Sequence, residues 1–575
     1  MMNLFQKSSK IFFRSWNISI VALLSVVISV IYLVTRFMGY TLHNSAFLYL
    51  NDSLFFSFAF FILNLYIGYE YFYKIKKNDI EECISAQKNG LLKTYAAFFC
   101  MLTILPIITF FIYLISNFVV AYINHVTAVS YYQHVFWVLV IYIFLLGILA
   151  NMTGACLALK LNRLSAYSLF ALIIFVLSPV SEMIPGITHD SYGINIWPAK
   201  EIFSDILPPN LTWTIDVQYG ISYETFRWNL IFFWIFSVLA IFFFTVSKQK
   251  KNVVTGMIAF VFAAANLYGY FLPHFRVKMG PYPDDLFMLD YGYYSTHEQR
   301  EKEADFEILT YTMDFKIDRV LEAVVDMDIK SLSNHEYFEF TLYRGYEVNK
   351  IVDNLGNPLA FSREGDYITV DGNENLTNIK ISYHGYSPVF YSSNQGVCLP
   401  SFFPYYPMPG FLNIYCPSEE GGAFVKNEND LSEFKVYIKG GKNVYTNLNL
   451  FSETAGVFEG KSTGLSIMGG LITYKNEDGY HIYNQVAQYW GSSPIDSGYL
   501  NRLQNEINKI EQEEGAKKHL TLKDKKIFQS PETIVNRATM GISVWAENHV
   551  FIMSGNDSDL IKEIAYNLVK ENNHA

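Results

Sequence analysis

Asn17-Ile-Ser-Ile-Val-Ala-Leu-Leu-Ser-Val-Val-Ile-Ser-Val-Ile-Tyr-Leu-Val-Thr-Arg-Phe37 is an apolar run long enough to cross a lipid bilayer as a helix. A helix rises about 1.5 Å per residue, so roughly 20 residues span a hydrocarbon core of about 30 Å. Similar runs recur through the first half of the chain. Together they predict membrane spans near residues 17–37, 53–73, 94–123, 134–158, 165–184, 228–247 and 253–273.

The composition divides the 575 residues into two halves with different surroundings. Residues 1–275 carry 16 Lys and Arg against 11 Asp and Glu, whereas the remainder carries 27 against 42. The acidic second half has no cluster of Lys and Arg, which argues against a nucleic-acid surface. We predict an α-helical membrane domain of about seven spans at 1–275, a linker at 276–304, a β-rich domain at 305–475 and a small α/β part at 476–575.

Basic residues predict the orientation of the first half, because loops rich in Lys and Arg stay in the cytoplasm. These residues precede the first run and follow the second, fourth and sixth runs. No small-residue cleavage site follows the first run, so we expect it to remain in the cell membrane as a span. The N-terminus is therefore predicted to be cytoplasmic, and seven crossings would place residues 276–575 outside the cytoplasm.

Two segments on the predicted cytoplasmic side have the patterns of helices. Residues 4–16 mix basic and bulky apolar side chains, which is typical of a helix in the membrane interface; a plain positively charged anchor is the alternative. Residues 76–90 start with capping residues, place two glutamates in the first turn and end in Lys88 and Gly90, which predicts one short helix. A cytoplasmic partner can push such a helix. The candidate contact residues are Asp79, Ile80, Glu81, Glu82 and Ile84.

These features resemble the permease half of bacterial ABC transporters of the second exporter type, over about residues 1–250. The resemblance rests on the interfacial N-terminal helix, on six spans with a short cytoplasmic helix between the second and third, and on a broken segment after the fifth. It implies that the helix at about Asp79–Lys88 docks on a separate cytoplasmic ATP-binding subunit, and that permeases pair as a homodimer or heterodimer. The seventh run departs from this pattern, and we expect it to carry the second half across the membrane.

Charged residues within the predicted spans are few. Glu70 lies at the cytoplasmic end of the second run, in Gly68-Tyr-Glu-Tyr-Phe-Tyr-Lys74. Its carboxylate either pairs within the bundle or with a partner, or extends to the interface beside Lys74. Proton or ion pumping needs several such groups within the bilayer, so their scarcity favours an external energy source such as ATP hydrolysis on a partner.

From about residue 305 the pattern changes to alternating, aromatic-rich strands separated by turns, which predicts a sheet-rich domain. A helix near 499–514, a strand at 549–553 and a terminal helix from about 558 follow. Phe338-Glu-Phe-Thr-Leu-Tyr-Arg-Gly-Tyr-Glu-Val-Asn-Lys-Ile-Val-Asp353, Ile379-Lys-Ile-Ser-Tyr-His-Gly385 and Phe402-Phe-Pro-Tyr-Tyr-Pro407 resemble the N-terminal β domain of aminopeptidase-N-type zinc peptidases. The resemblance covers about residues 305–470.

That family binds zinc through H-E-x-x-H on a helix, with the glutamate as general base and a further Glu ligand downstream. The matching place here is Lys562-Glu-Ile-Ala-Tyr566, where a cation and a phenol replace both histidines and Glu563 is retained. The sequence ends at Ala575, so we expect no downstream ligand. The resemblance therefore implies a truncated relative without zinc or catalysis, and an ordinary amphipathic helix is the alternative.

Cys398 and Cys416 are the two cysteines of the second half. If that half lies outside the cytoplasm they are candidates for one disulfide, and the sequence leaves the bonded and unbonded states equally open. Gly456-Val-Phe-Glu-Gly-Lys-Ser462 is one residue short of a phosphate-binding loop. We therefore expect no ATP site, metal or other cofactor in this chain.

The sequence favours a non-catalytic permease subunit of an ABC transporter, powered by a separate ATPase, that exports or removes a peptide or lipid-like substrate. The second half would receive, gate or recognise that substrate. One alternative is a membrane-anchored metallopeptidase of the aminopeptidase-N type, completed by a distant histidine such as His384, His481 or His549. The other is a sensor or immunity protein that binds an extracellular peptide without moving it.

Overall fold

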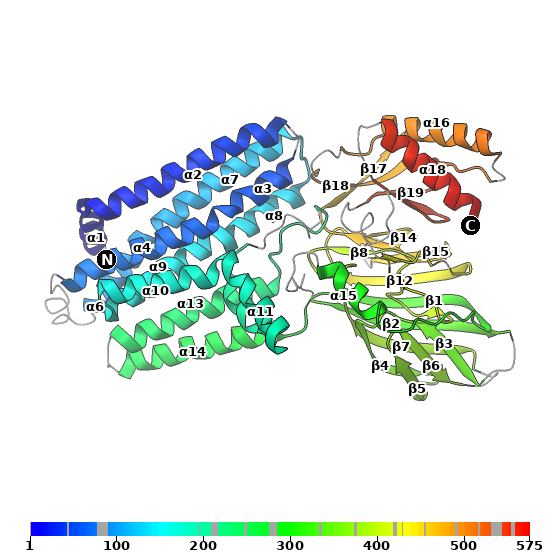
Figure 1. Ribbon diagram of the computed structural model, residues 1–575, viewed down its shortest axis with the longest axis horizontal. Coiled ribbons are helices and arrows are strands. Elements are labelled where there is room, and N and C mark those ends of the chain that lie inside the picture. Colours follow the sequence, from blue (N-terminus) through cyan, green and yellow to red (C-terminus); the bar gives the residue numbers. More distant parts are fainter. Residues whose placement is uncertain are drawn as a thin grey trace. The chain divides into compact units, whose positions relative to one another are not determined.

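The computed structural model forms two compact units (Figure 1). Unit 1 comprises Met1–Leu211 and Ile221–Leu272, and unit 2 comprises Thr212–Gly220 and Pro273–Ala575. Unit 1 is helical, and unit 2 is mainly β with a small α/β part, which confirms the predicted fold class. The structure describes residues 2–574 except 43–44, 78–89, 195, 209–216, 247–249, 275–284, 333–335, 373–375, 418–421, 428, 453–455, 489–492, 516–517, 531–542 and 554–557.

Unit 1 consists of helices, several of which join end to end into longer apolar segments. Among its described residues, six segments are long and apolar enough to cross a membrane: Trp16–Tyr40, Ala46–Lys74, Leu92–Ile123, Val129–Lys160, Thr225–Val246 and Asn252–Phe271. The helices are α1 (Met2–Arg14), α2 (Trp16–Leu42), α3 (Ala46–Phe55), α4 (Ser57–Lys77), α6 (Gly90–Leu102), α7 (Ile104–Ile123), α8 (Val129–Leu139), η1 (Val140–Leu145), α9 (Leu146–Lys160), α10 (Arg163–Leu177), η2 (Pro179–Glu182), α11 (Met183–Tyr192), α12 (Trp197–Ser204), α13 (Thr225–Val246) and α14 (Lys250–Phe271).

The run at 165–184 was predicted as a fifth span, and that prediction is wrong in its length. α10 ends at Leu177 after 15 residues, and Ser178 adopts an extended conformation (φ −78°, ψ 153°). Pro179 explains the break, because proline lacks an N–H and disfavours a helical conformation in the residue before it. Fifteen residues give a helix of about 22 Å, which is shorter than a hydrocarbon core of about 30 Å.

Helices α4 and α9 approach each other closely through small residues. A Cβ added to Gly68 would collide with the backbone oxygen of Asn151, and one added to Gly154 would collide with that of Leu65. The Asn151 Nδ2 donates to Asn64 Oδ1 at 3.0 Å. Glycines that admit a neighbouring backbone, and amides that bond across helices, are the usual means of holding helices together in a membrane.

The β part of unit 2 is built around a seven-stranded sheet in the order β14-β15-β12-β1-β2-β7-β4. β1 pairs antiparallel with β2 and parallel with β12. Smaller sheets have the orders β5-β6-β3-β9, β13-β16-β8 and β10-β11. The strands are β1 (Phe306–Ile317), β2 (Leu321–Ser331), β3 (Tyr337–Thr341), β4 (Tyr346–Val352), β5 (Phe361–Glu364), β6 (Tyr367–Asp371), β7 (Asn378–Gly385), β8 (Val397–Leu399), β9 (Met408–Pro409), β10 (Tyr415–Cys416), β11 (Ala423–Phe424), β12 (Ser432–Gly440), β13 (Tyr445–Thr446), β14 (Asn449–Ser452), β15 (Val457–Ser462) and β16 (Ile467–Gly469).

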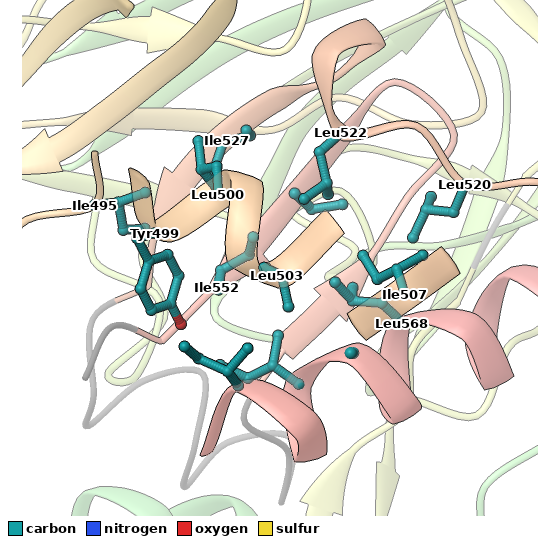
Figure 2. Close-up of a cluster of buried hydrophobic side chains, with 14 of the residues drawn as sticks. Ile495, Tyr499, Leu500, Leu503, Ile507, Leu520, Leu522, Ile527, Ile552 and Leu568 are labelled. Atoms are coloured by element: carbon teal, nitrogen blue, oxygen red, sulfur yellow. The ribbon is translucent and has the colours of Figure 1, made fainter. Parts of the chain in front are cut away.

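The α/β part has a mixed five-stranded sheet in the order β17-β18-β19-β21-β20. Helices α16 (Ser497–Glu514) and α18 (Ser558–His574) pack with this sheet around one apolar cluster (Figure 2). Leu500, Leu503 and Ile507 of α16 meet Ile564 and Leu568 of α18 there. The strands are β17 (Ile472–Glu477), β18 (Tyr480–Gln485), β19 (Lys526–Gln529), β20 (Ser543–Trp545) and β21 (His549–Ile552), with the short helix η3 (Leu522–Asp524) before β19.

The stretch 276–304, predicted to be a linker, contains the helix α15 (Asp285–Tyr294). This helix belongs to unit 2. The chain after it pairs with the β part, where the Lys302 N–H donates to the Phe411 carbonyl at 2.9 Å. The folded part of unit 2 therefore includes residues of the predicted linker, ahead of strand β1.

Candidate functional site

Helix α18 carries the positions at which the resemblance predicted a degenerate zinc site, and they point away from the apolar cluster. Lys562 and Glu563 are exposed, and the Tyr566 side chain is 47% exposed. The Lys562 ammonium lies 3.3 Å from Asp559 Oδ1, one turn earlier on the same helix. The opposite face, which includes Ile564, is buried. α18 therefore covers the five-stranded sheet, and its outward face presents a cation, a carboxylate and a phenol.

The histidines considered as substitute ligands each have separate local partners. His384 on β7 lies 3.0 Å from Asn349 Oδ1 through its Nδ1. His481 on β18 bonds the Tyr474 hydroxyl at 2.8 Å. Across the part of the chain that the structure describes, no group of three or more His, Cys, Asp and Glu side chains is placed to hold a metal ion.

His549 on β21 lies in a hydroxyl–imidazole–amide chain. The Ser466 hydroxyl is 2.7 Å from His549 Nε2, and His549 Nδ1 is 2.8 Å from Asn548 Oδ1. Because the amide oxygen can only accept, Nδ1 donates to it and Nε2 accepts from Ser466. The order of groups is that of a serine nucleophile with its base. Ser466 is 0% exposed and His549 1% exposed, so a substrate does not reach them. The hydrogen bonds through His549 instead connect the β part to the α/β part.

The same junction contains a half-buried lysine and a buried asparagine. The Lys526 ammonium donates to the carbonyl oxygens of Thr446, at 2.9 Å, and Leu448. The Asn447 amide donates to Asn548 Oδ1 at 3.0 Å. We call Asn447, Ser466, Lys526, Asn548 and His549 the polar seam.

Two basic groups of the polar seam have displaced pKa values. Burial lowers the pKa of Lys526 to about 8. Burial, together with the nearby cations of Lys525 and Lys526, lowers the pKa of His549 to about 3. His549 is therefore neutral at physiological pH, as its hydrogen bond from Ser466 requires.

A second buried polar cluster fixes α15 to the β part. Asp290 is 0% exposed, and its Oδ1 accepts from the Tyr343 hydroxyl at 2.8 Å and from the Arg344 guanidinium. The guanidinium carbon lies 4.1 Å from the ring centre of Tyr293 and 4.8 Å from that of Tyr294. The arginine thus pairs with a carboxylate of α15 and lies over two aromatic rings of the same helix.

Asp366, in the turn between β5 and β6, adds a second carboxylate to this cluster. Its Oδ1 accepts from the Arg344 backbone N–H at 2.5 Å, and its Oδ2 accepts from the Tyr294 hydroxyl at 3.0 Å. Burial raises the pKa of Asp366 to about 6, while Arg344 and these hydrogen bonds act in the opposite direction. Burial also raises the pKa of Asp290. Both carboxyl groups therefore hold their protons more tightly than exposed ones.

Glu70 in unit 1 lies inside the helix bundle. Its side chain is 3% exposed, and its carboxylate accepts from Arg163 Nη2 at 2.8 Å and from the Tyr167 hydroxyl at 2.7 Å. Both partners come from α10, so the group pairs within unit 1 rather than extending beside Lys74.

The segment predicted to contact an ATPase lies outside the described residues. It includes Asp79, Ile80, Glu81, Glu82 and Ile84. The helices on either side of it are described: α4 ends at Lys77, and α6 begins at Gly90. The predicted N-terminal helix is present as α1, with Ser8 and Phe12 buried and Lys7, Lys10 and Arg14 exposed.

The structure does not join the two cysteines of the candidate disulfide, which stays a prediction. Cys398 is buried on β8, where it pairs in register with Met468 of β16, and Cys416 is exposed on β10. The two cysteines therefore lie in different sheets and are not bonded to each other. The Pro- and aromatic-rich segment between them is held instead by buried rings, among them Tyr405 and Tyr406.

No protein-family model matches the sequence, and a search of curated proteins gave no match. Among solved structures, the C-terminal half is similar to native leukotriene A4 hydrolase from Saccharomyces cerevisiae, with 13% identity, a TM-score of 0.30, and coverage of 45% of this chain and 43% of that chain. It is also similar to an M1 zinc metallopeptidase from Deinococcus radiodurans, with 10% identity, a TM-score of 0.30, and coverage of 45% and 62%. The chain thus spans about half the length of these structures, and likeness at this level assigns no activity.

Sequence reasoning missed the partners of Glu70 and both buried clusters of unit 2. Arg163 is one of the basic residues that follow the fourth apolar run, on the side predicted for Glu70, and this was the available signal. The Ser466–His549 and Asp290–Arg344 contacts join residues 83 and 54 positions apart. No local pattern marks such pairs, because each member lies in an ordinary strand, turn or helix.

Proposed function

We propose that this chain is the membrane permease subunit of an ABC transporter that works with a separate cytoplasmic ATPase. Its substrate is a peptide or lipid-like molecule, which unit 2 receives or recognises. Permeases of this kind work in pairs, so the chain pairs with itself or with a second permease. In this proposal the N-terminus is cytoplasmic, and the 78–89 segment is the ATPase contact.

The attachment of α1 is the observation that supports the proposal best. The Ser8 carbonyl accepts from the Tyr71 hydroxyl of α4 at 2.7 Å, and the Ser8 hydroxyl donates to the Ala97 carbonyl of α6 at 3.3 Å. The Phe12 ring packs edge-on against Tyr71 at 5.4 Å. α1 is therefore fastened to both helices that flank the 78–89 segment. A force applied to that segment would act on three helices at once.

The charges within unit 1 support an external energy source. Several of its carboxylates are neutralised by arginines rather than arranged as a relay: Glu70 with Arg163 (2.8 Å), Asp52 with Arg36 (3.5 Å) and Asp205 with Arg227 (3.4 Å). A proton pathway needs carboxylates arranged in a relay across the membrane, whereas each of these three lies beside an arginine as an ion pair.

Unit 2 is proposed to bind rather than to cleave. The α18 positions that would hold zinc carry Lys562 and Tyr566, neither of which is a usual zinc ligand. The seam histidine His549 is enclosed and neutral. Recognition of a substrate by a folded unit requires neither group.

The test is co-purification of the full chain with its ATPase, followed by ATP turnover with candidate peptides and lipids. The variant Glu81→Lys/Glu82→Lys should reduce ATPase recovery at least about tenfold if these carboxylates lie in a contact hot spot worth a few kcal/mol. The matched control is Glu513→Lys/Glu514→Lys, an exposed pair at the end of α16 in unit 2, which should leave recovery unchanged.

Three results would contradict the proposal in different ways. Equal ATPase recovery with the variant and after deletion of residues 78–89 would exclude this contact and weaken the transporter assignment. Peptide binding without any change in ATP turnover would favour a sensor. Zinc-dependent peptide cleavage would favour a peptidase.

A further inference from the structure

Residues 217–220 lie in the connection between α12 and α13 of unit 1, yet they are part of unit 2. All four are buried: Val217 and Tyr219 are 2% exposed, Gln218 is 0% exposed, and Gly220 is buried. Unit 2 is thus assembled from two separate stretches of the chain. The described part of the short stretch, residues 217–220, lies in its interior.

Gln218 closes the end of the β8–β16 ladder. Its side-chain amide donates to the Val397 carbonyl at 2.7 Å and to the Gly469 carbonyl at 3.0 Å. Val397 and Gly469 are the last register partners of these two strands. The Gln218 carbonyl accepts from the Leu471 N–H at 2.7 Å. A side chain with two donors on one nitrogen is required to bridge two carbonyls in this way.

The surrounding chain is shaped to admit this segment. The Tyr219 carbonyl accepts from Gln395 Nε2 at 2.9 Å, and its ring lies 5.3 Å from that of Tyr391. Gly470 has φ +117°, and a Cβ there would lie 2.5 Å from the Gln218 carbonyl oxygen. Gly470 therefore serves two needs, a left-handed backbone and a close approach of the segment.

The residues that follow are fixed within unit 1. The Ile221 N–H donates to His134 Nε2 at 3.1 Å, and the Ser222 carbonyl accepts from the Tyr142 hydroxyl at 2.7 Å. Gln218 and Ile221 are anchored in different units but are three residues apart, which is at most about 10 Å of extended chain. α13 begins shortly afterwards at Thr225.

We propose that residues 217–220 are a fixed tether that couples the start of α13 to the β8–β16 ladder of unit 2. The coupling is a property of the chain itself, and it does not depend on whether the protein transports, senses or cleaves its ligand.

Cysteine accessibility tests whether the tether is buried within unit 2. In the full chain in detergent, with Cys83, Cys100 and Cys416 replaced by serine, Val217→Cys is compared with Tyr192→Cys, whose native side chain is 74% exposed. We expect maleimide to label Val217→Cys at least about 100-fold more slowly under native conditions, because a buried thiol reacts only after local opening. Both should label equally in denaturant. Equal native rates would overturn the proposal.

A second variant tests the close approach of Gly470 to the Gln218 backbone. Gly470→Ala should expel the tether and raise labelling of Val217→Cys at least about tenfold, as expected when a local structure opens. Gly356→Ala is the matched control, because Gly356 also has a positive φ (+83°) but nothing lies within 4 Å of an added Cβ. Labelling that rises equally in both variants would indicate general destabilisation and overturn the proposed role of Gly470 in holding the tether. A Gly470→Ala chain that does not fold leaves the first comparison decisive.

Discussion

Acid should weaken the attachment of β21 to the β part, because His549 is held neutral within the polar seam. The folded-state pKa of about 3 lies below the ordinary value of 6.5. A lowered histidine pKa contributes stability that is fully present above the unfolded pKa and is lost as the pH falls towards the folded one. At about 1.4 kcal/mol per unit, the full loss below pH 3 is on the order of 5 kcal/mol. Between pH 7 and pH 5 the expected loss is roughly 2 kcal/mol.

Hydrogen exchange of the full chain in detergent measures this effect as the free energy of opening at β21, after correction for intrinsic exchange rates. His549→Gln removes the titrating group and should abolish most of the pH dependence. His481→Gln, on β18 of the same sheet, should retain it, because His481 bonds Tyr474 in an exposed pair. An unchanged opening free energy between pH 7 and pH 5, or an equal fall in the His549→Gln chain, would refute the reasoning.

Three further predictions concern other parts of the molecule. Asp366→Asn should stabilise the docking of α15 at pH 8 by about 1–3 kcal/mol and have little effect at pH 4. The reason is that a carboxyl with a raised pKa contributes stability below its unfolded pKa, and this stability is lost as the pH rises through about 6. Hydrogen exchange at α15 measures the free energy of this docking. Protease added to right-side-out vesicles should digest residues 276–575 and spare 74–93, and protection of the second half would refute the orientation. Purified chain should hold less than one zinc ion and cleave no aminopeptidase substrate, whereas cleavage abolished by Glu563→Gln would contradict this.

The orientation prediction depends on α10. If the six long segments of the described part cross the membrane and α10 does not, both ends of unit 1 lie on the same side. If α10 also crosses, tilted or in a thinned bilayer, unit 2 lies on the opposite side from the N-terminus. The protease experiment therefore measures the number of crossings as well as the side.

Features that arise from neighbouring residues were predictable from the sequence. The long apolar runs identified the six segments, and α16 was expected near 499–514 because its pattern is locally complete. Asp496 caps its first turn by accepting from the Tyr499 N–H at 2.7 Å, and Gly515 ends it with φ +67°. The break after Leu177 had a local signal in Pro179. Hydropathy averaged over about 20 residues does not reveal it, because a single proline changes that average very little.

Features that depend on distant residues were not predictable in the same way. α15 lies in a stretch that was read as a linker, and its attachment depends on Arg344, 54 residues after Asp290. The disulfide was left open because the sequence does not place Cys398 and Cys416 in different sheets. The tether carries no pattern of its own, because a four-residue piece of a loop gains its role from strands formed much later in the chain.

The tether has a consequence for how the protein is made. Gln218 bonds to residues 179 and 251 positions later in the chain. At a synthesis rate of about 5–20 residues per second, Gly469 leaves the ribosome roughly 13–50 s after Gln218. During this interval the segment has no ladder to close, although the helices before it are already complete. Gln218 can therefore close the β8–β16 ladder only after Gly469 has been synthesised, so this step joins a later part of the chain to an earlier one.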